Sequence, residues 1–161
     1  GHGGKPLTFQ VEPVNTPLGY SVGAVFVEVR VDPLLGRVRV TRVAGCYDPG
    51  TVLNRKTARS QVLGGVIWGI GFTLFEHTLV DPATARILNP NLSGYLVPVN
   101  ADVPDIQVQF IDEPDPASDA LGARGFGETP MTGVTAAIAN AVFHATGKRV
   151  RDLPLTQDKL L

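Results

Sequence analysis

The strongest constraint on the fold is a run of alternating residues near the amino-terminal end of the chain. Valines recur at every second position from Val25 to Val31, with charged and aromatic residues between them. This period of two is typical of a strand with one buried face and one wet face. The sequence Asp-Pro-Leu-Leu-Gly at residues 32–36 predicts a turn, and a second alternating run begins at Val38. Together these segments predict a β-hairpin.

A glycine-rich segment without charged residues follows the hairpin. Apolar residues recur at every fourth position from Val62 to Leu74, which predicts a helix over Gln61–Phe75. The stretch is shorter than the roughly 20 apolar residues that a membrane-spanning helix needs. Its glycines are unfavourable inside a helix, so they indicate either close packing against another helix or direct contact with a ligand. Packing is the more common of the two reasons.

A third alternating run, Ile106 to Phe110, predicts one further strand. The expected fold class is α+β, with a mostly antiparallel sheet packed by the Gln61–Phe75 helix and by a second helix, Pro130–Thr146. Residues 1–20 contain several prolines, which predicts a lead-in, a linker or residues added in cloning. The expected domain therefore covers residues 21–161.

The second helix is preceded by a loop, Gly122–Glu128, with three glycines and one acid. Glycine at this density favours an irregular backbone that approaches another group closely. Thr129 is predicted to cap the helix, Pro130 to take its first position, and Gly147 to end it. Two interpretations stay open: a loop that contacts an anion or a cofactor, or a structural turn followed by an acid that only complements the helix dipole.

Composition excludes several classes of function. The 161 residues carry a net charge of −1, which gives no electrostatic support for binding nucleic acid or an anionic membrane. Cys46 is the single cysteine, so no internal disulfide is possible, and a buried, inert thiol is expected. His2, His77 and His144 lack the spacing of paired metal ligands, and no metal site built from side chains is predicted.

Four segments, taken in order, resemble the large subunit of the molybdenum hydroxylases, the xanthine dehydrogenase and aldehyde oxidase family. The Ala-Arg-Ser-Gln sequence before the paired glycines and the Arg-Asp-Leu-Pro ending are most similar to the bacterial aldehyde-oxidising branch. The resemblance covers about residues 21–161 and is carried by Gly23–Pro33, Ala58–Gly71, Gly122–Glu128 and Ala145–Thr156.

The resemblance implies that the chain is the carboxyl-terminal part of a molybdopterin-binding domain. The implied cofactor is molybdopterin with molybdenum, in the cytosine dinucleotide form, and iron–sulfur clusters and FAD are implied on partner subunits or domains. Glu128 is implied as the catalytic general base, Gln61 as a residue near the cofactor, and Gly125, Phe126 and Gly127 as a loop that passes beside it.

The function that the resemblance implies is oxidation of aldehydes to carboxylic acids. Alternatives are oxidation of a purine or another N-heterocycle, or a non-catalytic assembly domain that keeps the fold. Because the family's large subunit is much longer, we expect this chain to be a fragment or a separately encoded piece that is inactive without the remainder of the subunit. Exposed apolar surface would then favour self-association. The resemblance places the enzyme in the bacterial cytoplasm or periplasm.

Overall fold

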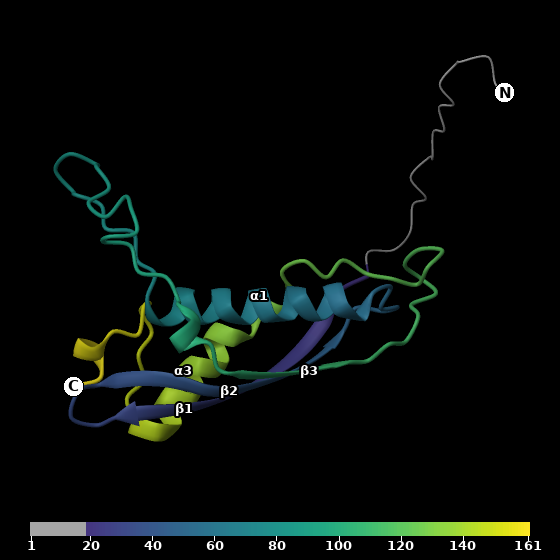
Figure 1. The fold of residues 1–161 in the computed structure, drawn as a ribbon, viewed down its shortest axis with the longest axis horizontal. Helices are drawn as coiled ribbons and strands as arrows, with labels where there is room; N and C mark the ends of the chain where they lie inside the picture. Colours follow the sequence, from purple (N-terminus) through teal and green to yellow (C-terminus); the bar gives the residue numbers. More distant parts are fainter. Residues whose placement is uncertain (1–18) are drawn as a thin grey trace, which may run out of the picture.

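The computed structural model describes residues 19–161, so all but the end of the predicted lead-in lies outside the described residues. Figure 1 shows the elements in their spatial arrangement. In chain order they are β1 (Val22–Asp32), β2 (Arg37–Asp48), α1 (Arg55–Leu74), the 3₁₀ turn η1 (Asn100–Asp102), β3 (Asp105–Phe110), α2 (Thr129–Thr132), α3 (Val134–Thr146) and the 3₁₀ turn η2 (Gln157–Lys159).

The predicted hairpin is confirmed. β1 and β2 pair in antiparallel fashion from Val22 opposite Asp48 to Asp32 opposite Arg37, with one irregularity after Glu28. The turn is closed because an Asp32 carboxylate oxygen accepts hydrogen bonds from the backbone amides of residues 34 and 35. Gly36 has φ 62°, a conformation that favours glycine.

The third strand is also confirmed, and the fold is α+β. β3 lies beside β2, giving the order β1-β2-β3, and the longer of the two pairings is antiparallel. β3 itself runs parallel to β2, from Arg42 opposite Asp105 to Tyr47 opposite Phe110, a direction that the sequence analysis did not anticipate. A parallel neighbour requires a crossover connection, and α1 is part of that connection.

The glycine-rich helix is confirmed and begins earlier than its apolar repeat. Asn54 caps α1, because its side-chain oxygen accepts hydrogen bonds from the amides of Lys56 and Thr57. Close packing accounts for two of the glycines. A Cβ at Gly65 would lie 2.9 Å from Cβ of Pro130, and a Cβ at Gly69 would lie 2.6 Å from Cβ of Val134.

The second predicted helix is corrected in two details. Glu128, not Thr129, is the residue that precedes the helix, and its side chain makes no capping hydrogen bond. The helix is then interrupted at Gly133, which separates α2 from α3. The predicted end is confirmed, since Gly147 has φ 73° and donates its amide to the Phe143 carbonyl at 2.7 Å.

Both long helices contribute to one core with the inward side chains of the sheet. The carboxyl-terminal tail closes this core with Leu155 and Leu160. The opposite face of the sheet is polar, and there Glu28 accepts from Thr41 at 2.6 Å and pairs with Arg42 at 3.1 Å. The other buried apolar residues of the core are Val40, Val43, Tyr47, Val62, Val66, Ile70, Ile106, Val134, Ile138 and Val142.

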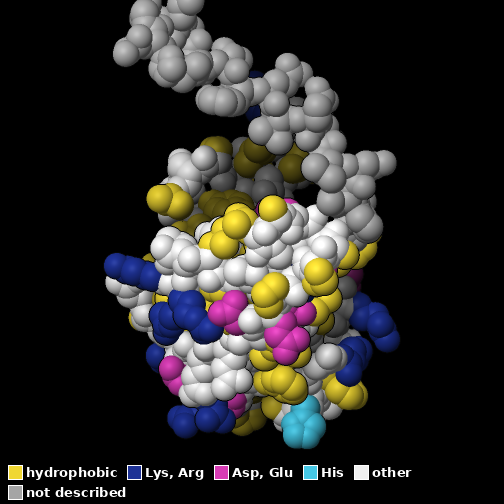
Figure 2. Space-filling view, turned by 90° about the vertical axis from the view of Figure 1, so that its right-hand side faces the viewer, with side chains coloured by type: hydrophobic (Ala, Val, Ile, Leu, Met, Phe, Trp, Pro, Cys, Tyr) yellow, Lys and Arg dark blue, Asp and Glu magenta, His cyan; other side chains and the backbone are white. Residues whose placement is uncertain are grey.

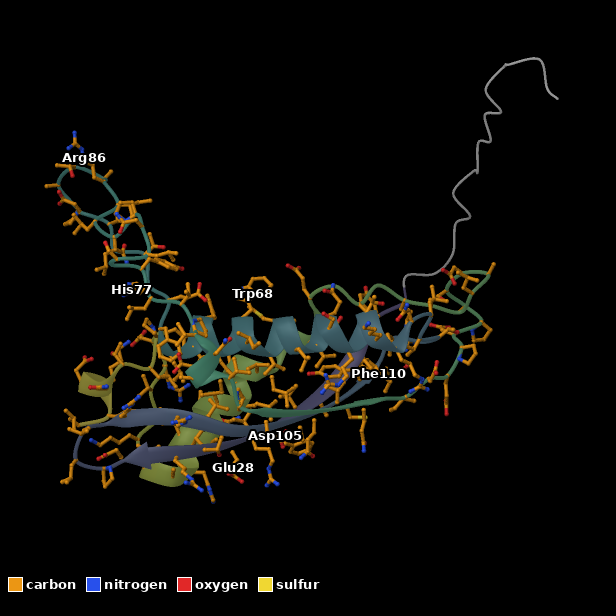
Figure 3. The ribbon with its side chains drawn as sticks, viewed as in Figure 1. Glu28, Trp68, His77, Arg86, Asp105 and Phe110 are labelled. Atoms are coloured by element: carbon orange, nitrogen blue, oxygen red, sulfur yellow. The ribbon has the colours of Figure 1, made fainter. Side chains whose placement is uncertain are left out.

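An arm of residues 77–97 projects from the end of α1, away from the sheet (Figures 1 and 3). Its two sides are joined by a bridge between Val80 and Ile87. Asn89 stabilises the base of the arm with two hydrogen bonds. Its side-chain amide donates to the His77 carbonyl at 2.7 Å and accepts from the Leu79 backbone amide at 2.9 Å. Leucines 88 and 92 on the arm are 64% and 76% exposed. The arm therefore presents apolar side chains outside the core.

Candidate functional site

The glycine loop is fastened to the end of β2 by backbone hydrogen bonds. Ala123 forms an antiparallel bridge with Gly50. The Thr51 amide donates to the Gly122 carbonyl, and the Arg124 amide donates to the Pro49 carbonyl, both at 2.8 Å. Two chain segments that are far apart in sequence are thus held side by side, and their geometry is fixed by main-chain contacts.

The Arg124 side chain adds an ionic link to the same junction. Its guanidinium lies 2.7 Å from an Asp48 carboxylate oxygen and 3.0 Å from Asp115, and the side chain is only 14% exposed. The backbone amide of Gly50, together with Arg124, holds the pKa of Asp48 below its usual value. Hydrogen bonds to Asp48 and Asp115 in turn raise the pKa of Arg124. The link is therefore charged on both sides at neutral pH.

The ring of Phe126 fixes the middle of the loop. It meets Tyr47 edge-on, with 5.6 Å between ring centroids, and meets Phe110 in the same manner at 5.7 Å. Tyr47 is buried, and burial raises the pKa of its hydroxyl to about 12, so the phenol stays neutral. These three aromatic rings link the loop to β2 and β3.

Three of the residues implied by the resemblance meet at one hollow. Gln61, Phe126 and Gly127 all line a depression of about 340 Å³ between the glycine loop and the start of α1. Thr51 and Arg124 also line it, and the Thr51 hydroxyl oxygen and the Arg124 Nε are buried without a hydrogen-bond partner among the described residues. Such unpaired buried groups are costly unless a ligand or water completes them. The remaining lining comes from Pro49, Val52, Leu53, Asn54, Thr57, Ala58 and Ala123.

The other two implied residues flank this hollow without lining it. The Gly125 carbonyl accepts a hydrogen bond from Ser21 Oγ at 2.6 Å. Glu128 follows Gly127 directly, is exposed, and stands at the start of α2. A carboxylate in this position is accessible and can accept a proton from a group bound at the rim. A Cβ at Gly125 or Gly127 would meet nothing within 4 Å, so both leave open space beside the backbone.

The sequence analysis missed the residues that hold the loop in place. It singled out neither Thr51, Asp48 nor Asp115, and it treated Arg124 only as part of the loop Gly122–Glu128. The turn at residues 48–50 was the available signal, because it marks the point where β2 ends. The residues opposite that turn come from a distant part of the chain, and residue spacing does not reveal such tertiary contacts.

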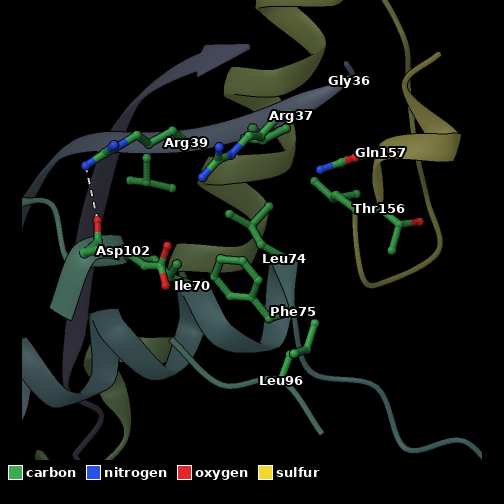
Figure 4. A pocket seen from close by; sticks show the side chains of 14 residues that line it. Gly36, Arg37, Arg39, Ile70, Leu74, Phe75, Leu96, Asp102, Thr156 and Gln157 are labelled. Carbon is green, nitrogen blue, oxygen red and sulfur yellow. Dashed lines mark hydrogen bonds between the residues drawn. The ribbon is translucent and has the colours of Figure 1, made fainter. Parts of the chain in front are cut away.

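A larger hollow of about 550 Å³ lies toward the other end of α1 (Figure 4). Its floor is apolar, including Ile70, Leu74 and Phe75, and Arg37 and Arg39 stand at its rim. Arg39 donates to the Ala101 carbonyl at 3.2 Å. This hollow contains none of the residues that the resemblance implied.

The face of the molecule in Figure 2 is mixed in character, and the described residues form no cluster of metal ligands. On the face shown in Figure 2, basic, acidic and apolar side chains are interspersed. Within residues 19–161, no group of three or more His, Cys, Asp or Glu side chains is arranged to hold a metal ion. The helices of this same region include none that is long and apolar enough to cross a membrane.

Comparisons with known proteins agree on one family. The model of the molybdopterin cofactor-binding domain matches residues 7–104. The chain is 50% identical over 136 residues to the aldehyde oxidoreductase molybdenum-binding subunit PaoC of Escherichia coli K12, covering 84% of this chain and 19% of PaoC. It is 40% identical over 138 residues to the putative xanthine dehydrogenase molybdenum-binding subunit XdhA of the same organism, covering 86% of this chain and 18% of XdhA.

Solved structures give the same result. The aldehyde oxidoreductase from Desulfovibrio gigas superposes with a TM-score of 0.79 at 31% identity, over 88% of this chain and 15% of that one. Quinoline 2-oxidoreductase from Pseudomonas putida 86 superposes with a TM-score of 0.75 at 30% identity, over 81% of this chain and 17% of that one. The chain thus spans about a fifth of the length of the curated relatives that it matches.

Proposed function

The chain belongs to the family of molybdopterin cofactor-binding domains, and from this premise we propose that it forms one wall of the cofactor site in the catalytic subunit of a molybdenum hydroxylase. The observation that carries the proposal is the hollow where Gln61, Phe126 and Gly127 meet. This hollow joins two of the four segments that carry the family resemblance, Ala58–Gly71 and Gly122–Glu128, although they lie far apart in the sequence.

The residues of the hollow fit a polar, ring-shaped cofactor. The unpaired Thr51 hydroxyl can donate or accept a hydrogen bond, and the unpaired Arg124 Nε can donate one. The Gln61 side-chain amide can donate through its nitrogen and accept through its oxygen. Gly127 leaves its backbone open to close approach. Since the described side chains form no metal-ligand cluster, the pterin rather than this chain would hold the metal.

In this proposal Glu128 is the general base. When bound, the molybdenum cofactor would supply the oxidising chemistry, a two-electron oxidation of an aldehyde carbon in which water provides the added oxygen and two protons are released. The Glu128 carboxylate would accept one of these protons, and its exposed position at the rim gives it access to a substrate. Phe126, held by Tyr47 and Phe110, fixes the backbone two residues before Glu128. Gln61 orients the cofactor from the opposite wall.

We propose aldehydes as the substrate class. Support comes from the higher identity to a subunit named for aldehyde oxidation, 50%, than to one named for xanthine oxidation, 40%. The second candidate is a purine or another N-heterocycle, and the xanthine dehydrogenase relative supports it. A substrate screen of the complete enzyme separates the two: aldehydes should be turned over with a kcat/KM at least tenfold above that for purines or quinolines.

The proposal also covers the chemical form of the cofactor and the groups that carry the electrons away. We propose the cytosine dinucleotide form of molybdopterin, with iron–sulfur clusters and FAD on partner subunits that accept the electrons. The bacterial relatives named as molybdenum-binding subunits support separate partner chains. Nucleotide analysis of the extracted cofactor and a visible spectrum of the purified complex would test both parts.

The decisive experiment measures molybdenum and oxidised pterin in the complete subunit that carries this sequence. We expect one of each per subunit, and a large loss of both in Gly127→Val, whose side chain would fill the space beside the loop. Ala136→Val, at an exposed position of α3 outside the hollow, is the matched control and should retain both. Full cofactor content in Gly127→Val would contradict the assignment of the hollow.

We further propose that the 161 residues alone do not turn over aldehydes. The hollow is open on one side, and this chain supplies only about a fifth of the length of its relatives. The purified chain should contain neither molybdenum nor pterin. Stoichiometric cofactor, or robust aldehyde oxidation by the chain alone, would show that this part of the proposal is wrong.

A further inference from the structure

The outer side of α1 carries a line of exposed residues that includes two large aromatic side chains. Gln61, Gly64, Trp68 and Phe72 follow one another at helical spacing, and all four are exposed. Trp68 is 45% exposed and Phe72 is 44% exposed. Figure 3 shows Trp68 projecting from the side of α1 that faces away from the sheet. In the part of the chain that the structure describes, no element covers this line.

Two adjacent glycines of α1 differ in what surrounds them. At Gly65, an added Cβ would lie 2.9 Å from Pro130 Cβ and 3.2 Å from the Met131 nitrogen, so packing inside the chain explains this glycine. At Gly64, an added Cβ would meet nothing within 4 Å. Glycine is among the least favourable residues inside a helix. Nothing within residues 19–161 compensates for that cost at Gly64.

The surroundings of α1 extend the exposed line into a larger surface. The arm of residues 77–97 rises from the end of α1 on the same side as Trp68 (Figures 1 and 3). It presents Leu88 and Leu92, which are 64% and 76% exposed. At the other end of the line, Gln61 lines the hollow of the candidate site. The surface is therefore continuous with the proposed cofactor site.

We propose that the outer side of α1, defined by Gln61, Gly64, Trp68 and Phe72, is the docking surface for the remainder of the molybdenum-binding subunit. An apolar segment of that remainder approaches the α1 backbone at Gly64 and covers Trp68 and Phe72. The inference rests on the proposed function. Two observations favour this occupant: the relatives are about five times as long as this chain, and α1 carries no charge between Val62 and Leu74, which suits an apolar partner.

The first test measures the effect of Gly64→Ala on Tm in the isolated chain and in the complete subunit, where opposite signs are expected. In the isolated 161-residue chain, Gly64→Ala should raise Tm by about 2–4 °C, because the helix gains a better helix former in open space. In the complete subunit the same substitution should lower Tm, because the added methyl group separates α1 from the covering segment. Gly65→Ala should lower Tm in both contexts. A rise in Tm with Gly64→Ala in the complete subunit would overturn the proposal.

The second test measures coverage directly and does not depend on cofactor. In a Cys46→Ser background, Trp68→Cys is labelled with a thiol reagent, and the labelled peptide is quantified by mass spectrometry. We expect the labelling rate in the complete subunit to be at least tenfold below that in the isolated chain. Equal rates would overturn the proposal. Labelling of the isolated chain that slows as its concentration rises would also overturn it, because the occupant would then be a second copy.

These outcomes separate the docking surface from the proposed function. Slow labelling at position 68 in a complete subunit that binds no molybdenum would support the docking surface while the cofactor role fails. Fast labelling at position 68 in a subunit with full molybdenum content would overturn the docking surface while the cofactor role stands. If Trp68→Cys fails to fold, Phe72→Cys gives the same measurement one helical turn further along.

Discussion

Arg124 contacts Asp48 at two atoms, a carboxylate oxygen at 2.7 Å and the backbone carbonyl at 3.1 Å. The same guanidinium reaches Asp115 at 3.0 Å, so one side chain joins the glycine loop, the end of β2 and the acidic loop of residues 112–119. Because the loop carries Phe126, Gly127 and Glu128, the position of the candidate base depends on this contact. The consequence is that a residue outside the reacting groups should affect both stability and turnover.

Replacing Arg124 by Met keeps the aliphatic bulk and removes the ionic link. We expect a loss of several degrees in Tm of the chain, because Asp48 and Asp115 are left partly buried without a cationic partner. Arg55→Met is the matched control: Arg55 pairs with Asp112 at 2.6 Å, but its side chain is 66% exposed, so its loss should change Tm little. Equal effects of the two substitutions would show that the Arg124 contact is an ordinary surface pair.

The link to Asp48 predicts a pH dependence of stability. Since the pKa of Asp48 is lowered in the folded chain, its ionised form stabilises the fold at pH values above its ordinary pKa of about 3.9. That contribution is lost as the pH falls through the lowered value. The difference in Tm between the unmodified chain and Asp48→Asn should therefore be largest near pH 6–7 and should shrink below about pH 4. A difference that is unchanged at pH 3 would contradict this.

Glu128→Gln tests the general base. In the complete enzyme this substitution should lower kcat by roughly 10²–10⁴ or more, because the amide cannot accept the proton, whereas molybdenum content should stay the same. Glu113→Gln, in the exposed acidic loop, provides a control that removes one charge elsewhere. Unchanged kcat in Glu128→Gln would mean that another group accepts the proton.

Phe126→Ala tests whether the aromatic contacts hold the loop. Loss of the two edge-on contacts with Tyr47 and Phe110 should lower the free energy of unfolding by about 2 kcal/mol, with a smaller loss for Phe126→Leu. Phe26→Ala is the matched control, since Phe26 is 70% exposed, and should change the free energy by less than about 0.5 kcal/mol. Urea-induced unfolding of the three variants gives the comparison. If Phe126→Ala left the free energy of unfolding unchanged, the aromatic contacts would not be what holds the loop in place.

Local features of the fold were predictable from the sequence because their causes are local. The valine alternation and the Asp-Pro turn are sufficient for the hairpin, and the apolar repeat is sufficient for most of α1. The left-handed conformation of Gly147 follows from its position after the last apolar residue of α3. In each case the residues that determine the element lie within a few positions of one another.

Features that depend on distant partners were not predictable. Nothing in the sequence of β3 specifies that it pairs with β2 in parallel, because alternation is the same in either direction. The interruption at Gly133 was missed, since a single glycine is tolerated in many helices. Gln61 and Gly127 were linked only by family resemblance, and the ion pairs of Arg124 join residues that sequence spacing does not relate.

The parallel pairing of β3 with β2 also has a kinetic consequence. The hairpin closes a short turn, whereas β3 must return to β2 across the whole segment between Asp48 and Asp105. Ring closure over such a span costs more chain entropy and is slower, so the hairpin should form early and the three-stranded sheet late. The loop that carries Glu128 follows β3 in the chain and is fastened to the end of β2. The site should thus be the last part of the molecule to acquire its structure, and mutations that slow β3 docking would lower the yield of active protein without touching the site.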